Sequence, residues 1–235
     1  MSQCEFLNRL VNKLDAAGTP LMISGPLGNT FYGEPRSTSG IDIVIEPSAV
    51  QLEQFLKLIS DLRYVNPQSA NESLARRSMS NLVDYLAGWK ADLIIRKNRP
   101  CSRTEFTVRR RAELLGVAAC VAAAEDVILS DLEWAKAGDS ERPPRDAVDV
   151  LNRLGDGLDL PCLRHCAREP GVDELPEKLP AARGAPGASD DCTRSKQPVS
   201  KPPALSKAVV HAIHLAFTCI EQGKVNPADW SLAVC

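Results

Sequence analysis

Hydrophobic residues recur at helical spacing in several segments of the first 160 residues. Over 49–62 the apolar side chains fall at positions i, i+3, i+4, i+7 and i+10, which gives a helix one apolar face. Ser69-x-x-Glu72 and Ser102-x-x-Glu105 have the form of capping boxes, so we expect each serine to open a short helix. The predicted helices are the first ~16 residues, 49–62, the segments after these serines, 124–136 and 144–154.

Short β-like runs lie between these helices. Leu21-Met22-Ile23 is an apolar run that ends at Ser24-Gly25-Pro26, and a weak helix or loop follows through Tyr32. Residues 81–86 and 89–96 are two further runs separated by Ala87-Gly88, which indicates a hairpin. Strands that alternate with helices indicate an α/β (α+β) fold with a small mixed β-sheet and flanking helices.

The strand predicted over 41–46 has two different faces. Side chains alternate along a strand, so Ile41, Ile43 and Ile45 point to one side and form a core face. The other side carries Gly40, Asp42, Val44 and Glu46 and opens towards a cleft.

The character of the chain changes after about residue 160. Prolines at 170, 176 and 180 interrupt an otherwise helical pattern, because each removes a backbone donor and clashes one turn back. We therefore expect a domain over 1–160, a proline-interrupted helical extension over 161–183 and a disordered linker over 184–203. Apolar spacing resumes in 204–235 and predicts a short helical C-terminal segment.

Composition is that of an ordinary globular protein, with 44% hydrophobic and 25% charged residues. The net charge of -2 gives no global electrostatic case for nucleic-acid binding. The N-terminus lacks a signal pattern, and no apolar run approaches the ~20 residues of a membrane span, so we expect a cytoplasmic location. The 8 cysteines follow no repeating CxxC pattern, and we expect reduced thiols rather than a disulfide framework.

The polar loop that precedes the 41–46 strand carries a family resemblance. Gly33-Glu34-Pro35-Arg36-Ser37-Thr38-Ser39-Gly40 leads directly into Ile41-Asp42-Ile43-Val44-Ile45-Glu46. Over roughly residues 20–160 the chain resembles the nucleotidyltransferase superfamily with the DNA polymerase β-like fold. Its bacterial branch related to abortive-infection toxins is the nearest in pattern. The resemblance implies transfer of a nucleoside monophosphate from an NTP to a hydroxyl acceptor, with Mg²⁺.

The same resemblance assigns roles to individual residues. Asp42 matches the second carboxylate of the Asp-x-Asp strand, and Asp92 matches the third carboxylate from a neighbouring strand. Both are expected to be catalytic and to bind the metal. The alternative for Asp92 is a charge on an edge strand that faces solvent. The cofactor-binding positions implied by the resemblance are Gly25, Arg36, Ser37, Thr38 and Arg145.

Three positions depart from the family pattern. Gly40 replaces the first carboxylate, Pro26 replaces a serine of the phosphate-binding turn, and Asp131 replaces a lysine. Proline supplies neither a hydroxyl nor a backbone N–H to a triphosphate. We therefore expect impaired catalysis. The alternatives are a non-catalytic interaction module of a toxin–antitoxin-like pair, with an antitoxin-like protein as partner, or a residual enzyme in which Glu46 or Ser39 completes a rearranged metal site.

Two further motifs are ambiguous. Cys162-x-x-His165-Cys166 and His211-x-x-His214 together offer four zinc ligands, although their spacing fits no standard finger and the thiols could simply be packed. Arg109-Arg110-Arg111 could contact a polyanion, but such a run is more often a solvated helix end.

Overall fold

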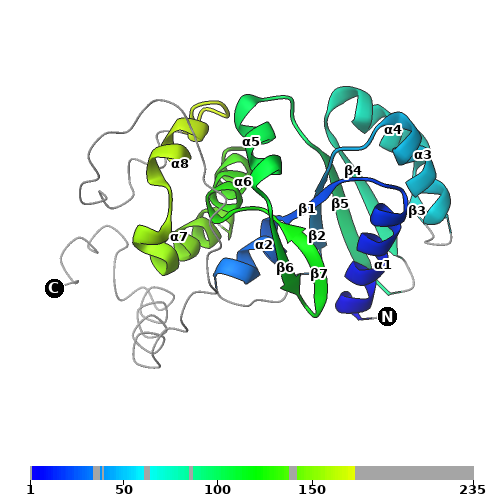
Figure 1. Ribbon diagram of the computed structural model, residues 1–235, viewed down its shortest axis with the longest axis horizontal. Helices are drawn as coiled ribbons and strands as arrows, with labels where there is room; N and C mark the ends of the chain where they lie inside the picture. Colours follow the sequence, from blue (N-terminus) through cyan, green and yellow to red (C-terminus); the bar gives the residue numbers. More distant parts are fainter. Residues whose placement is uncertain are drawn as a thin grey trace. The chain divides into compact units, whose positions relative to one another are not determined.

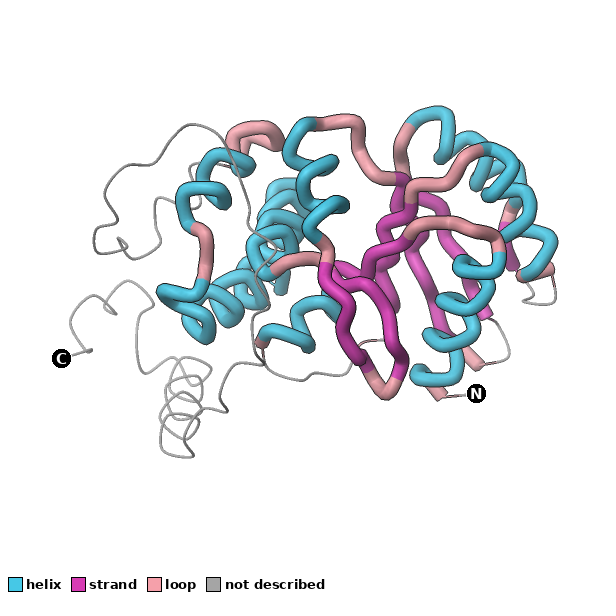
Figure 2. The backbone as a smooth tube through the Cα atoms, viewed as in Figure 1, coloured by secondary structure: helices cyan, strands magenta, loops and turns pink. Residues whose placement is uncertain are grey.

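A computed structural model describes residues 2–33, 38, 40–60, 64–84, 87–137 and 142–172. These residues form a seven-stranded mixed sheet with strand order β3-β4-β5-β2-β1-β7-β6 and helices packed around it (Figures 1 and 2). The predicted fold class, α+β with a mixed sheet, is confirmed. Within the described ranges, no helix combines the length and the apolar character that a membrane crossing needs.

The centre of the sheet is formed by the strands that the apolar runs predicted. β2 pairs antiparallel with β1 and parallel with β5, and β5 continues antiparallel to β4, as the hairpin signal predicted. The seven strands are β1 (Leu21–Ser24), β2 (Gly40–Ile45), β3 (Tyr64–Val65), β4 (Met79–Asp84), β5 (Trp89–Ile95), β6 (Arg110–Leu114) and β7 (Val117–Val121).

The helices gather in two groups. α1, α3 and α4 lie together on one side of the sheet, whereas α2 and α8 pack on α6 and α7 also contacts α2 and α6 (Figure 1). The helices are α1 (Gln3–Ala16), α2 (Gly25–Tyr32), α3 (Ala49–Leu58), α4 (Pro67–Arg76), α5 (Pro100–Val108), α6 (Ala124–Ala137), α7 (Arg142–Leu154) and α8 (Leu160–Ala167), with a 3₁₀ turn over Gly155–Gly157.

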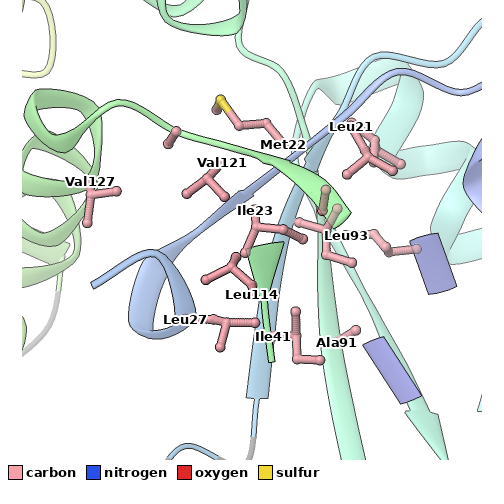
Figure 3. Packing of buried hydrophobic residues seen from close by; sticks show 14 of the residues in the cluster. Leu21, Met22, Ile23, Leu27, Ile41, Ala91, Leu93, Leu114, Val121 and Val127 are labelled. Atoms are coloured by element: carbon pink, nitrogen blue, oxygen red, sulfur yellow. The ribbon is translucent and has the colours of Figure 1, made fainter. Parts of the chain in front are cut away.

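The predicted alternation of β2 is confirmed. Ile41, Ile43 and Ile45 are buried, whereas the residues between them are partly exposed. Figure 3 shows Ile41 and Ala91 near Ile23 of β1, in the packed interior of the sheet. Burial of these apolar side chains holds β2 in one orientation, so its polar side chains must all face the opposite way.

Two helices begin at prolines rather than at the predicted serines. α4 starts at Pro67, and the side chain of Asn66 accepts hydrogen bonds from the first-turn amides. α5 starts at Pro100 after Arg99 and has no side-chain cap. Proline fits the first helical turn because its missing N–H would have no partner there. The capping-box predictions for Ser69 and Ser102 were therefore wrong, although both helices exist.

The β6–β7 hairpin was not predicted, and the arginine run was assigned to a helix end. Arg109 does follow α5, where its guanidinium lies 4.3 Å from the Phe106 ring centroid. Arg110 and Arg111 instead belong to β6. The connecting turn is Leu115-Gly116, and both residues have positive φ, 52° and 77°. Hairpin turns of this kind usually carry Asn-Gly or Asp-Gly, so Leu115-Gly116 is not a recognisable hairpin signal.

Only part of the predicted C-terminal organisation lies within the described residues. α8 and the turn that ends at Val172 fall inside the predicted helical extension over 161–183. Residues 173–183, the predicted linker over 184–203 and the predicted helical segment over 204–235 lie outside the described residues. Those boundaries stay predictions.

Leu115 gives a test of the hairpin turn. The left-handed conformation costs a leucine roughly 1–2 kcal/mol, and asparagine tolerates it better. Leu115 is 43% exposed, so its replacement removes little packing. We expect Leu115→Asn to raise the free energy of unfolding by about 1 kcal/mol in urea denaturation, with an unchanged m-value. Leu115→Ala, which keeps the strained conformation, is the control. Equal stabilities for the two variants would contradict this account of the turn.

Candidate functional site

Asp42 and Asp92 are direct neighbours across two parallel strands. The Cα register of β2 and β5 pairs Asp42 with Asp92, and cross-strand partners carry their side chains on the same sheet face. The predicted placement of the two aspartates on adjacent strands and one face is therefore confirmed. The alternative, a solvent-facing charge on an edge strand, is excluded for Asp92 because β5 lies between β4 and β2.

Polar residues continue this register on both sides. Asn81 of β4 pairs with Asp92, and Ser24 of β1 pairs with Asp42. Asn81 is exposed at one end and Ser24 is buried at the other. We call Asn81, Asp92, Asp42 and Ser24 the carboxylate row. It crosses four adjacent strands on the sheet face opposite the isoleucines of β2.

Gly25 brings the start of α2 directly against this row. Its φ is +56°, and a Cβ atom placed there would lie 2.1 Å from Oδ2 of Asp42. A side chain at this position would therefore push the carboxylate away. From the family resemblance we expected Gly25 to lie in a phosphate-binding turn. In the structure it lies beside Asp42. Pro26 follows in the first turn of α2, where it supplies no N–H.

Burial changes the electrostatics of Asp42. Desolvation, with repulsion from the Asp92 carboxylate as the second cause, raises the pKa of Asp42 to about 6, while Lys90 acts in the opposite direction. Among the described residues, none donates a hydrogen bond to this carboxylate. A buried carboxylate without donors favours its neutral form until a cation or donor reaches it.

Lys90 forms an ion pair with the other carboxylate, that of Asp92. Its Nζ lies 3.0 Å from Oδ1 and 3.1 Å from Oδ2 of Asp92, and it donates a hydrogen bond to Oδ2. Lys90 is also the register partner of Gly40, the position at which the family has its first carboxylate. Sequence reasoning missed this lysine, although the alternation of a strand places residues 90 and 92 on one face.

The space beside Gly40 is open. A Cβ atom there would have the carbonyl oxygen of Lys90, at 4.0 Å, as its nearest neighbour. The backbone of Gly40 is not in the left-handed region, so other residues can adopt its conformation. No steric constraint therefore prevents a carboxylate side chain at residue 40. The site lacks this carboxylate only because the residue is glycine.

The predicted metal ligands reach only part of a metal site. Across the described ranges, no group of three or more His, Cys, Asp or Glu side chains could hold a metal ion. Asp42 and Asp92 supply two carboxylates. At position 40, where the resemblance expects another carboxylate ligand, this chain has a glycine. The zinc hypothesis loses both of its thiolate ligands, because Cys162 and Cys166 are disulfide-bonded, and the two C-terminal histidines lie outside the described residues.

The remaining predicted cofactor positions are only partly among the described residues. Thr38 is engaged locally, since its Oγ1 donates to the carbonyl oxygen of Gly40 and accepts from the Gly40 amide. Arg36 and Ser37 lie outside the described residues. Arg145 is exposed on α7. Their roles in cofactor binding stay predictions.

Asp131 belongs to the helix packing. It is 4% exposed, and Asn29 of α2 donates a hydrogen bond of 2.8 Å to its Oδ2. Asp131 therefore points inward, one of the two directions that its helical face predicted. A lysine at this position would have to place its ammonium beside Asn29 in the interior, which is costly.

A cavity of about 310 Å³ adjoins the carboxylate row. Its floor includes Val44 and Ile94, which lie two residues beyond Asp42 and Asp92 on the same strand faces. Its walls carry charges of both signs, and Lys97 and Arg99 pair with Glu133 of α6. Both polar and apolar parts of a small molecule could therefore find contacts here.

A disulfide joins two walls of this cavity. Cys101 in α5 is bonded to Cys166 in α8 across 65 residues of sequence, and the Cys101 amide donates to Oε1 of Glu169. The prediction of reduced thiols was therefore wrong for this pair. Sequence spacing could not have found it, because the two cysteines meet only through the tertiary fold. Cytoplasmic disulfides are rare, so this bond does not favour the predicted location.

Comparisons with known proteins add little to this geometry. No protein-family model and no curated protein matches the chain. The structure of the antibiotic-resistance factor ANT(2'')-Ia is similar over 74% of this chain and 93% of its own, with a TM-score of 0.48 and 9% identity. JHP933 from Helicobacter pylori is similar over 73% and 75%, with a TM-score of 0.39 and 14% identity. Similarities this low support no argument about function.

The raised pKa of Asp42 predicts a dependence of stability on pH. The native protein holds this proton more tightly than the unfolded chain, whose carboxyl has a pKa near 3.8, so stability from Asp42 is present at low pH and lost between about pH 4 and 6. We expect Asp42→Asn to raise the free energy of unfolding at pH 7.5 by about 3 kcal/mol, with the gain vanishing near pH 4. Asp156→Asn, at an exposed carboxylate, is the control. A gain independent of pH would contradict the desolvation of Asp42.

The disulfide predicts a separate stability effect. Closing a loop of 65 residues restricts the unfolded chain, so the double variant Cys101→Ser with Cys166→Ser should lose about 3–4 kcal/mol in chemical denaturation. Reduction of the unmodified protein should give a loss at least as large, because Cys162 is disulfide-bonded as well. Cys120→Ser, which removes a free thiol, serves as the control. A midpoint unaffected by reductant would show that the bond does not form in solution.

Proposed function

We propose that this chain is a nucleotidyltransferase-fold protein in which the carboxylate row and the start of α2 form a nucleotide site. The observation that carries the proposal is the meeting of Gly25 with Asp42, beside Asp92 in register. These are the residues that the family resemblance assigned to the phosphate turn and to two of the three carboxylates. They lie far apart in the sequence and come together at one place.

The chemical class follows from the resemblance. The substrate is an NTP, the reaction is transfer of a nucleoside monophosphate, and the acceptor carries a hydroxyl group. The cavity beside Val44 and Ile94 supports a binding place for the acceptor, because its floor continues the two strand faces that carry the aspartates. Arg36, Ser37, Thr38 and Arg145 are the further residues proposed for the nucleotide.

Mg²⁺ is the cofactor that the family implies, where it offsets charge on the transferring phosphate. The described residues do not fit the arrangement that the family uses. Gly40 removes one carboxylate, and the ammonium of Lys90 lies within hydrogen-bond distance of Asp92. Pro26 removes a donor from the phosphate turn. We therefore propose that transfer is strongly impaired in this chain.

The pairing of Lys90 with Asp92 favours a second candidate. A carboxylate that is already neutralised is a poor metal ligand, so the chain could act as a non-catalytic binding module. An antitoxin-like protein is the partner proposed for that case, as one member of a toxin–antitoxin-like pair. Retention of nucleotide without any product would distinguish this module from an enzyme.

The direct test is transfer of label from radioactive NTP to acceptors in a cell extract with Mg²⁺. We expect the unmodified protein to give product at background level. Gly40→Asp, which fills open space two residues before Asp42, should raise product by at least about tenfold, since it restores charge neutralisation in the site. Asp131→Lys is omitted from the restoring set because Asp131 is buried against Asn29.

Matched variants make this test decisive. Gly157→Asp adds the same charge at an open position in the 3₁₀ turn and should leave product at background. Product from the unmodified protein that disappears in Asp42→Ala would show a working enzyme and would overturn the proposed impairment. Failure of every variant to bind NTP, with the fold intact by circular dichroism, would overturn the nucleotide site itself.

A further inference from the structure

We infer that Lys90 is the resident cation of the carboxylate row and that it excludes divalent metal ions from Asp42 and Asp92. This inference rests on the proposed function in taking the row as the site. The inference goes beyond the proposed function because it assigns a role to Lys90, a residue to which the family resemblance assigns none. The chemical class at issue is a divalent cation in competition with an ammonium group of the chain itself.

The geometry of Lys90 is that of a group in the metal's place. Its Nζ is nearly equidistant from both oxygens of Asp92, at 3.0 and 3.1 Å. A divalent cation shared by Asp42 and Asp92 would need one of these oxygens and would also lie close to the ammonium. A bound divalent cation must therefore displace the Lys90 side chain or be repelled by its ammonium group, which weakens metal binding.

The register explains why a lysine fits here. Lys90 pairs across the sheet with Gly40, where a side chain is absent and the space is open. A carboxylate at residue 40 would have added a third negative charge on this face. With glycine there, the described part of the row holds two carboxylates, and one ammonium from the neighbouring strand lies against them.

Lys90 affects metal binding at the carboxylate row more than it affects the stability of the fold. Its side chain is 46% exposed and that of Asp92 is 19% exposed, and ion pairs near the surface contribute little to stability. Removal of the lysine should therefore leave a folded protein with two uncompensated carboxylates in register. Such a pair is a minimal site for a divalent cation that keeps several of its waters.

The test measures metal binding directly and without nucleotide. Mn²⁺ is titrated into the protein and the free ion is followed by electron paramagnetic resonance. We expect weak binding by the unmodified protein and at least about tenfold tighter binding by Lys90→Ala, since removing a unit charge at this distance is worth roughly that factor near a surface. The gain should disappear in the double variant Lys90→Ala with Asp42→Asn.

Lys57→Ala is the matched control. It removes the same charge from an exposed lysine that pairs with Glu53 on α3, away from the row, and should leave Mn²⁺ binding unchanged. Equal affinities for Lys90→Ala and the unmodified protein would overturn the inference, as would an equal gain in Lys57→Ala. Either result would leave the nucleotide site standing, because NTP binding and transfer are measured separately.

Discussion

The register between β2 and β5 is the constraint on which the whole site depends. Six consecutive pairs, from Gly40 with Lys90 to Ile45 with Ile95, fix the two strands against each other. A slip of one residue would turn Asp92 towards the buried face and bring Ala91 beside Asp42. The buried isoleucines of β2 make such a slip costly. Core packing on one face therefore fixes the pairing of Asp42 with Asp92 on the other.

The chemistry of the row is a balance among three charged groups. Burial desolvates Asp42, and this desolvation, with repulsion from Asp92 as the second cause, raises its pKa to about 6. Asp92 is paired with Lys90. The carboxylates thus differ in character although they are neighbours in register. Burial makes the first harder to ionise, and an ammonium pairs with the second.

Much of this arrangement could be predicted from the sequence. Alternation placed Asp42 opposite the isoleucines, and the loop before β2 indicated a candidate site there. The interaction of Lys90 could not be read in the same way, because alternation gives the face of a long side chain but not the group that its tip reaches. The disulfide between Cys101 and Cys166 depends on tertiary contact. The β6–β7 hairpin was missed because Leu115 is an unusual turn residue.

We propose that an ammonium group occupies the place of a metal ion beside Asp92. The decisive measurement is a crystal structure of the unmodified protein, grown with MnCl₂ and measured at the manganese absorption edge. We expect Nζ of Lys90 within hydrogen-bond distance of Asp92 and no anomalous peak between the two aspartates. A manganese peak bound by both Asp42 and Asp92, with Lys90 turned away, would contradict it.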